Sequence, residues 1–369
     1  MPIRVLVVDD SMFMRRLASD ILNADPDIEV VDTARDGAEA IRKVCRLRPD
    51  CVTLDLVMPG QDGLTTLRRI MAECPTPVVV LSAHTRRGAD LTVECLAAGA
   101  VGFVPKPSGE LSLDLEKVRT WLTDEVKAAA RSNIAGITSP IVSRIRKGRH
   151  PKGASDKIVV IGASTGGLQT LRAILAALPA DFPAPMIVVQ HVPTALFSQS
   201  LTESLNAVSE PPVTLAANGQ VICPGTVYLA PGGYHLTVEP WSNQRSPCGT
   251  AKAGTTVFHL EGAAPGALSP SVDITMQSVS GLYAENTVGV ILTGMGHDGV
   301  AGMRSIKQAG GKTLVQDESS LVFGMPKAVI DAGYADRVLP LCEMAQAIAD
   351  AVASDEACGA PRQEGAALV

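Results

Sequence analysis

Residues 158–167 read IVVIGASTGG, a run of branched apolar side chains that ends in a cluster of small residues. The apolar run predicts a buried strand, and the glycines behind it predict a tight turn into a helix, as in an α/β fold. Gly162–Gly166 fits the pattern G-x-S-x-G, which exposes Ser164 at the N-terminus of that helix. Free backbone N–H groups at a helix N-terminus favour a developing oxyanion, so we expect Ser164 to be a nucleophile.

A glycine-rich turn after a strand can also bind a dinucleotide, but that use requires an acidic residue at the end of the next strand. The next predicted strand, Met186–Gln190, is followed by His191 instead, which argues against a dinucleotide. A serine nucleophile needs a base, and histidines occur at positions 84, 150, 191, 235, 259 and 297. His191 is the favoured base because its strand follows the Ser164 helix and ends at the same edge of the sheet.

The acid that orients this base is expected at a third strand end. The predicted strand Val288–Leu292 leads into a glycine-rich turn that contains Asp298. Taken alone, Asp298 also fits the N-cap of the helix that follows it. The chain order Ser, His, Asp differs from the Ser, Asp, His order of α/β-hydrolases, which indicates a separately evolved triad.

The first part of the chain has an α/β pattern as well. Five short β-branched runs alternate with amphipathic stretches: Arg4–Val8, Glu29–Thr33, Cys51–Leu54, Val78–Leu81 and Val101–Val104. They predict a five-stranded parallel, flavodoxin-like sheet flanked by helices. The second block is expected to be a doubly wound, mostly parallel α/β domain. Turn signals within Val221–Leu236 predict an antiparallel excursion, with a further strand near Thr255–Leu260.

Chemically active side chains follow the predicted strands of the first block. They are Asp9 and Asp10 after the first strand, Asp55 after the third, Ser82 after the fourth and Lys106 after the fifth. Three carboxylates at one sheet edge repel one another unless a cation joins them, and their hard oxygens suit Mg²⁺. A single acid at a strand end is usually a solvated loop residue, but five positions in this order favour a phosphoryl-accepting site with Asp55 as the nucleophile.

Composition restricts the remaining possibilities. The 369 residues predict two or three domains, and the net charge of −6 with 3% aromatic residues argues against broad nucleic-acid binding. The N-terminus does not read as a secretory signal and the chain lacks a long uninterrupted apolar run, which predicts a cytoplasmic protein without membrane insertion. The eight cysteines show no metal-binding spacing and are expected to be reduced, without disulfides.

The first block resembles a response-regulator receiver domain over residues 3–122. The likeness rests on the acidic pair, on Asp55 with Met58-Pro59-Gly60 behind it, on Ser82 and on Lys106-Pro107. The resemblance implies that Asp55 is the phospho-acceptor, that Asp10 and Asp55 bind Mg²⁺ with the help of Asp9, and that a sensor histidine kinase is the phosphodonor. It also implies that Ser82 and Phe103 form a switch pair, through which phosphorylation repacks a nearby surface.

The second block resembles the catalytic domain of the chemotaxis protein-glutamate methylesterases over residues 157–350. The matching stretches are Gly162–Gly167, Gln190–Pro193, Pro224-Gly225, Tyr228–Pro231, His235-Leu236, Pro270–Asp273, Thr293–Gly299, Gln316–Glu318 and Gly324–Pro326. The resemblance implies that Ser164 is the nucleophile, His191 the general base and acid, and Asp298 the orienting acid. It further implies that Thr165, His235 and Met295 line the site, with Met295 near the oxyanion hole.

The reaction implied by this resemblance is hydrolysis of glutamate methyl esters, and deamidation of glutamines, on the cytoplasmic helices of methyl-accepting chemoreceptors. No cofactor is implied for the hydrolase domain, and a monomer is expected. Two other functions stay open: the same chemistry on a protein outside chemotaxis, and a receiver-controlled binding module with an inactive hydrolase site.

The expected domains are a receiver over residues 1–125, a basic linker over 126–156, a catalytic domain over 157–352 and a frayed tail over 353–369. Our hypothesis is that the unphosphorylated receiver packs over the Ser164 edge and that phosphorylation of Asp55 weakens this packing. Two departures from the family pattern are the Gly/Ser-rich segment 239–254 and His297. We expect the segment to alter access to the site and His297 to compete for Asp298.

Overall fold

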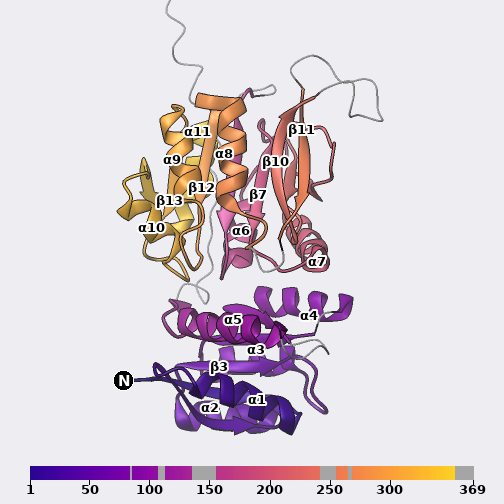
Figure 1. Ribbon diagram of the computed structural model, residues 1–369, viewed down its shortest axis with the longest axis vertical. Helices are drawn as coiled ribbons and strands as arrows, with labels where there is room; N and C mark the ends of the chain where they lie inside the picture. Colours follow the sequence, from indigo (N-terminus) through magenta and orange to yellow (C-terminus); the bar gives the residue numbers. More distant parts are fainter. Residues whose placement is uncertain (84, 107–112, 135–154, 242–254, 265–267, 354–369) are drawn as a thin grey trace, which may run out of the picture.

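The computed structural model describes residues 1–83, 85–106, 113–134, 155–241, 255–264 and 268–353. It contains two α/β units, one above the other along the long axis (Figure 1). Most of the predicted linker, segment 242–254, the tail from residue 354 on, and the histidines at positions 84 and 150 lie outside the described residues. No helix in the described part of the chain is both long and apolar enough to cross a membrane.

The N-terminal unit is the expected five-stranded parallel sheet, in the order β2-β1-β3-β4-β5. Its elements are β1 (Ile3–Val8), α1 (Met12–Asn23), β2 (Ile28–Ala34), α2 (Gly37–Leu47), β3 (Cys51–Asp55), α3 (Gly63–Glu73), β4 (Val78–Ser82), α4 (Arg86–Ala97), β5 (Gly102–Pro105) and α5 (Leu113–Ala130). The central strands β3 and β4 are buried along their whole length. Parallel strands bring their carboxyl ends to one edge, which gathers the predicted acidic residues there.

The C-terminal unit contains a seven-stranded sheet in the order β14-β13-β12-β6-β7-β9-β8, with every pairing parallel. Its elements are β6 (Ile158–Ala163), α6 (Gly167–Leu175), β7 (Met186–Gln190), α7 (Ala195–Asn206), β8 (Val213–Leu215), β9 (Val227–Leu229), β10 (Tyr234–Pro240), β11 (Thr256–Gly262), α8 (Val272–Tyr283), the 3₁₀ turn η2 (Ala284–Asn286), β12 (Thr287–Ile291), α9 (Val300–Gln308), β13 (Lys312–Gln316), α10 (Met325–Asp331), β14 (Arg337–Leu339) and α11 (Leu341–Ala353). Strands β10 and β11 form a separate antiparallel pair.

The antiparallel excursion expected over Val221–Leu236 is wrong in part. Strand β9 lies inside that range, but it joins the parallel sheet between β7 and β8. The antiparallel part of the prediction is confirmed by the isolated bridge of Val221 with Val257 and by β10, which begins at Tyr234 and pairs with β11. A strand of three residues is too short to display a periodic pattern, so tertiary packing rather than local sequence sets its partner.

The expectation that the chain lacks disulfides is also wrong. Cys45 of α2 and Cys74 at the end of α3 form a disulfide across 29 positions of sequence. Helices α2 and α3 pack against each other, and this neighbourhood follows from the fold rather than from cysteine spacing. The other cysteines of the described residues do not take part in a disulfide; they are Cys51, Cys95, Cys223 and Cys342.

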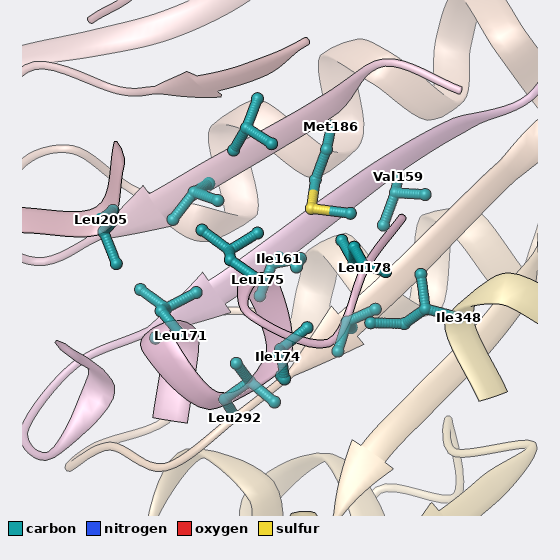
Figure 2. Packing of buried hydrophobic residues seen from close by; sticks show 14 of the residues in the cluster. Val159, Ile161, Leu171, Ile174, Leu175, Leu178, Met186, Leu205, Leu292 and Ile348 are labelled. Atoms are coloured by element: carbon teal, nitrogen blue, oxygen red, sulfur yellow. The ribbon is translucent and has the colours of Figure 1, made fainter. Parts of the chain in front are cut away.

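The main core of the C-terminal unit packs α6 against the sheet. Figure 2 shows Leu171, Ile174 and Leu175 of α6 beside Val159 and Ile161 of β6. Because α6 begins directly behind the Ser164 turn, this packing also positions the turn. The same apolar cluster continues into the N-terminal unit through Ala89 and Val93 of α4, so the two units share buried surface.

Candidate active site

The Ser164 turn joins β6 to α6, as the sequence predicts. The N–H of Ser164 donates to the carbonyl of Thr293 at 3.0 Å, and the side-chain amide of Gln190 donates to the carbonyl of Ser164 at 2.9 Å. Gly166 has a φ of +80°, a conformation that favours glycine. At Gly167 a Cβ would lie 2.0 Å from Oε1 of Gln190. Main-chain partners and close packing therefore fix the backbone of the turn.

His191 follows β7 and meets Asp298 in the loop behind β12. Nε2 of His191 lies 2.9 Å from Oδ2 of Asp298, and the two side chains are 8% and 11% exposed. Burial raises the pKa of Asp298, but hydrogen bonds from His191 and from backbone N–H groups outweigh burial, so the pKa lies below its ordinary value. Asp298 is therefore an anion at neutral pH, and Nε2 of His191 carries the shared proton. The lone pair of neutral His191 is then on Nδ1.

Asp298 also accepts hydrogen bonds from the beginning of α8. The donors are the N–H of Val272 at 2.7 Å, the N–H of Asp273 at 2.9 Å and Oγ of Ser271 at 3.2 Å. The alternative interpretation of Asp298 as the N-cap of the helix behind it is wrong, because Gly299 holds that position in α9. Asp298 instead accepts N–H groups in the first turn of α8, whose own N-cap is Ser271. The side chain of His297, the residue before Asp298, is exposed.

Ser164 and His191 lie on the wall of one cavity of about 1130 Å³. Thr165 and Met295, which were predicted to line the site, are part of the same wall. His235 was predicted with them, but among the described residues it is not one that lines this cavity. It lies on β10, and its Nδ1 is buried without a hydrogen-bond partner in the described part of the chain.

Helices α4 and α5 lie at the face of the N-terminal unit that is turned toward the C-terminal unit (Figure 1). Together with β5 they form the opposite wall of the cavity. Several hydrogen bonds join the two walls, among them the N–H of Gly166 to the carbonyl of Val101 at 3.1 Å, Oγ1 of Thr165 to Oε1 of Glu125 at 2.9 Å, and Nε2 of Gln169 to the carbonyl of Leu96 at 2.8 Å. Farther out, Oγ of Ser200 donates to Asp90 at 2.6 Å. The N-terminal unit therefore covers the edge that carries Ser164.

The two residues of the predicted switch pair lie in different surroundings. The ring of Phe103 stacks on Phe197 of α7 with their centroids 4.8 Å apart, so Phe103 bridges the two units. The hydroxyl of Ser82 is buried, donates to the carbonyl of Gly88 at 3.1 Å and accepts from Oγ1 of Thr92 at 2.7 Å. Ser82 is thus tied to α4, a helix that itself packs on α7.

Asp9, Asp10 and Asp55 converge at the carboxyl edge of the first sheet. One carboxylate oxygen of each lies within 4.8 Å of the others. Nζ of Lys106 lies 2.8 Å from Oδ2 of Asp9 and 2.9 Å from Oδ1 of Asp55. Burial raises the pKa of Asp55, and the neighbouring Asp9 raises it further, although Lys106 opposes both. A cluster of hard oxygen donors with excess negative charge fits Mg²⁺, as the sequence predicts.

Two residues that line the cavity between the two units were not predicted from the sequence. Glu125 shares the buried face of α5 with Leu122 and Val126, so an acid among apolar residues at helical spacing was the available signal. Phe197 lies in the first turn of α7, and its sequence neighbours carry no signal that would have marked it.

Comparison with known proteins gives matches to both halves of the chain. The family model of the CheB methylesterase matches residues 159–348, and the model of the response regulator receiver domain matches residues 5–116. A protein-glutamate methylesterase/protein-glutamine glutaminase of Symbiobacterium thermophilum is 44% identical over 366 residues, which cover 95% of this chain and 97% of the relative. One of Archaeoglobus fulgidus is 44% identical over 350 residues, which cover 94% and 97%.

Among solved structures, the crystal structure of the Thermotoga maritima CheB methylesterase catalytic domain is 41% identical to this chain. The match covers 53% of this chain and 97% of the other, with a TM-score of 0.48.

Proposed function

The chain belongs to the CheB methylesterase family, and we propose that it hydrolyses glutamate methyl esters and deamidates certain glutamines on chemoreceptors. The receiver domain in front of the catalytic domain makes it a phosphorylation-regulated enzyme of chemotactic adaptation. One observation carries the proposed chemistry: His191 is hydrogen-bonded to the anionic Asp298 and shares a cavity wall with Ser164.

In the proposed mechanism, Nδ1 of His191 takes the hydroxyl proton of Ser164 while Oγ attacks the γ-carbonyl carbon of the substrate. Asp298 holds the ring through Nε2 and stabilises the imidazolium that forms. The tetrahedral intermediate collapses as Nδ1 returns the proton to the departing group, which leaves as methanol from an ester or as ammonia from a glutamine. Water then attacks the acyl-enzyme by the same route and releases glutamate.

Backbone N–H groups at the start of α6 are the proposed donors to the negative oxygen of this intermediate, with Thr165 and Met295 beside it. The machinery consists of a hydroxyl, an imidazole and a carboxylate, and each has a defined role in proton transfer. We therefore infer that the hydrolase domain works without a cofactor.

In the receiver, Asp55 is the proposed phospho-acceptor, with a sensor histidine kinase as the donor. Asp9, Asp10 and Asp55 would hold Mg²⁺, which neutralises the charge of the transferred group, and Lys106 would bind one of its oxygens. We propose the domain division given above: a receiver (1–125), a linker (126–156), a catalytic domain (157–352) and a tail (353–369). Helix α5 extends five residues past the first of these boundaries, to Ala130.

We further propose that the receiver inhibits the enzyme by covering the Ser164 edge, and that phosphorylation of Asp55 releases it. The contacts of Thr165 with Glu125 and of Phe103 with Phe197 support this arrangement. The free-energy change required of phosphorylation is modest. About 5.5 kcal/mol of differential interaction shifts an equilibrium between two states, here the docked and the undocked receiver, from 1:99 to 99:1.

The test is methanol release from methylated receptor membranes, measured for Ser164→Ala and Asp55→Ala with and without a small-molecule phosphodonor. We expect no turnover from Ser164→Ala, and basal turnover without stimulation from Asp55→Ala. Ser209→Ala is the matched control, because its hydroxyl bonds the carbonyl of Pro211 outside the cavity. Turnover by Ser164→Ala would contradict the proposed nucleophile.

A fluorophosphonate probe separates the two alternative functions from this one. A hydrolase whose site is inactive would leave Ser164 unlabelled. A labelled Ser164 in an enzyme that releases no methanol from receptor membranes would instead indicate a substrate outside chemotaxis.

A further inference from the structure

Helices α8 and α9 begin side by side, and each is capped by an aspartate from the segment that starts the other. The carboxylate of Asp298, just before α9, accepts the N–H groups of Val272 and Asp273 at 2.7 Å and 2.9 Å. The carboxylate of Asp273, in the first turn of α8, accepts the N–H groups of Gly299 and Gly302 at 2.9 Å and 2.7 Å. The two helix ends therefore hold each other in place through four hydrogen bonds.

The segment that carries Asp298 is rich in glycine, and within it the N–H of Val300 donates to the carbonyl of His297 at 3.2 Å. Gly296 and Gly299 flank His297 and Asp298, with φ values of +87° and +106°. Glycine gives a chain access to many conformations, so the loop needs an external anchor to stay in one of them. Oδ1 of Asp273 is such an anchor, because it binds the N–H of Gly299, the residue directly after Asp298.

The second relevant feature is that the carboxylates of Asp273 and Asp298 lie close to each other. Both carboxylates are partly buried, and burial together with the nearby charge of Asp298 raises the pKa of Asp273. Two acids are tolerated here because each faces the N-terminus of a helix, where backbone N–H groups stabilise negative charge. The arrangement is costly to assemble, and its geometric result is that Asp298 points Oδ2 at His191.

We propose that Asp273 is a positioning residue for the hydrolase: its carboxylate fixes the glycine-flanked loop so that Asp298 stays hydrogen-bonded to His191. This inference rests on the proposed Ser164–His191–Asp298 machinery. Asp273 itself touches neither Ser164 nor His191 by any hydrogen bond among the described residues, so its effect passes through Asp298.

The test is the kinetics of methanol release by the full chain in the presence of a small-molecule phosphodonor. Asp273→Ala removes the acceptor, and we expect kcat to fall by about 10²-fold with KM changed less than about twofold, because displacement by an ångström can cost that much in rate. Asp273→Asn keeps an acceptor oxygen for the N–H groups of Gly299 and Gly302, so we expect kcat within about threefold of wild type.

The matched control is Asp336→Ala. Asp336 also accepts a backbone N–H, that of Thr313 at 2.9 Å, and pairs with Lys307 in the last turn of the same helix α9. We expect this variant to lose comparable thermal stability and to keep kcat within about twofold. If Asp273→Ala does not fold, Asp273→Ser, which offers a shorter acceptor, is measured in its place and is expected to lie between the alanine and asparagine variants.

A double-mutant cycle tests the route of the effect. In an Asp298→Ala background, the change of Asp273 to alanine should cost less than about twofold, because the residue it positions is gone. The proposal is overturned if Asp273→Ala keeps wild-type kcat, if Asp273→Asn is as impaired as Asp273→Ala, or if the loss persists in the Asp298→Ala background. Turnover by Ser164→Ala would instead overturn the proposed function. Failure of the proposed function can therefore be distinguished from failure of the proposed role of Asp273.

Discussion

The carboxyl group of Glu125 accepts a hydrogen bond from the hydroxyl of Thr165 at 2.9 Å, which ties receiver helix α5 to the residue directly after Ser164. Glu125 is buried, and its other oxygen has no hydrogen-bond partner in the described part of the chain. Burial raises the pKa of Glu125 to about 7, although interactions with Thr165 and Trp121 oppose the rise. Docking of the receiver therefore favours the protonated form of Glu125.

This contact predicts that receiver docking weakens as the pH rises. The pKa of Glu125 is 4.5 when it is exposed and about 7 when it is docked. The free energy of docking is therefore most favourable below pH 4.5 and becomes less favourable between pH 4.5 and 7. Above pH 7 it no longer changes, and the total loss of docking free energy is on the order of 3 kcal/mol. We expect basal turnover of the unphosphorylated wild type, relative to Glu125→Gln, to rise by about tenfold or more from pH 5.5 to 8.

Glu125→Gln is the reference because it keeps an acceptor for Thr165 and cannot ionise. Dividing the two rates cancels every pH dependence that both proteins share. A ratio that stays constant across this range would contradict the role of Glu125.

Asp298→Asn is expected to lower kcat by about 10³–10⁴-fold, because a neutral amide no longer fixes the tautomer and charge of His191. The asparagine can still accept N–H groups at the start of α8, so we expect the melting temperature to change by only a few degrees. Methanol release at saturating substrate and a thermal melt measure the two effects. Asp331→Asn, an exposed partner of Lys327, should match wild type in both.

Phe103→Ala is expected to raise basal turnover about tenfold and to reduce the factor by which a phosphodonor stimulates the enzyme. The stacked pair with Phe197 contributes on the order of 1 kcal/mol to docking beyond its buried area, and its loss favours the undocked state. Phe197→Ala should raise basal turnover to a similar extent, and the double variant should show little further increase over either single variant. Phe13→Ala, an exposed phenylalanine of α1, is the control. Unchanged basal turnover in both single variants would argue that the ring pair does not hold the receiver.

Removal of divalent cations by a chelator is expected to abolish stimulation by the phosphodonor and to leave basal turnover intact, because the metal is assigned to the receiver alone. Added Mg²⁺ should restore stimulation to the wild type and not to Asp10→Asn at the same concentration. Asp20→Asn, an exposed residue of α1, should respond as the wild type does. A fall in basal turnover on chelation would point to a metal in the hydrolase domain.

Much of this molecule could be predicted from its sequence because its determinants are local. The β-branched runs give the order of the buried strands, and parallel strands place their following residues at one edge. That rule alone brought Asp9, Asp10 and Asp55 together and put His191 on the same edge as Ser164.

The features that escaped prediction depend on contacts between distant parts of the chain. The pairing of β9, the disulfide of Cys45 with Cys74, and the contact of Glu125 with Thr165 all arise from how elements pack, which no local pattern encodes. Asp273 was part of a recognised motif, yet its partners on α9 become visible only when both helix ends are placed.

The hydrogen bond from Gly166 to Val101 connects the two domains through main-chain atoms alone. Substitution of the valine side chain leaves its carbonyl in place, and only proline at position 166 would delete the donor. This link therefore depends on the glycine at position 166 and not on the side chain of residue 101, and a receiver transplanted from a relative should find the same anchoring point. Substitutions of the surrounding side chains can then change how readily the domains separate, while this main-chain contact keeps their relative orientation.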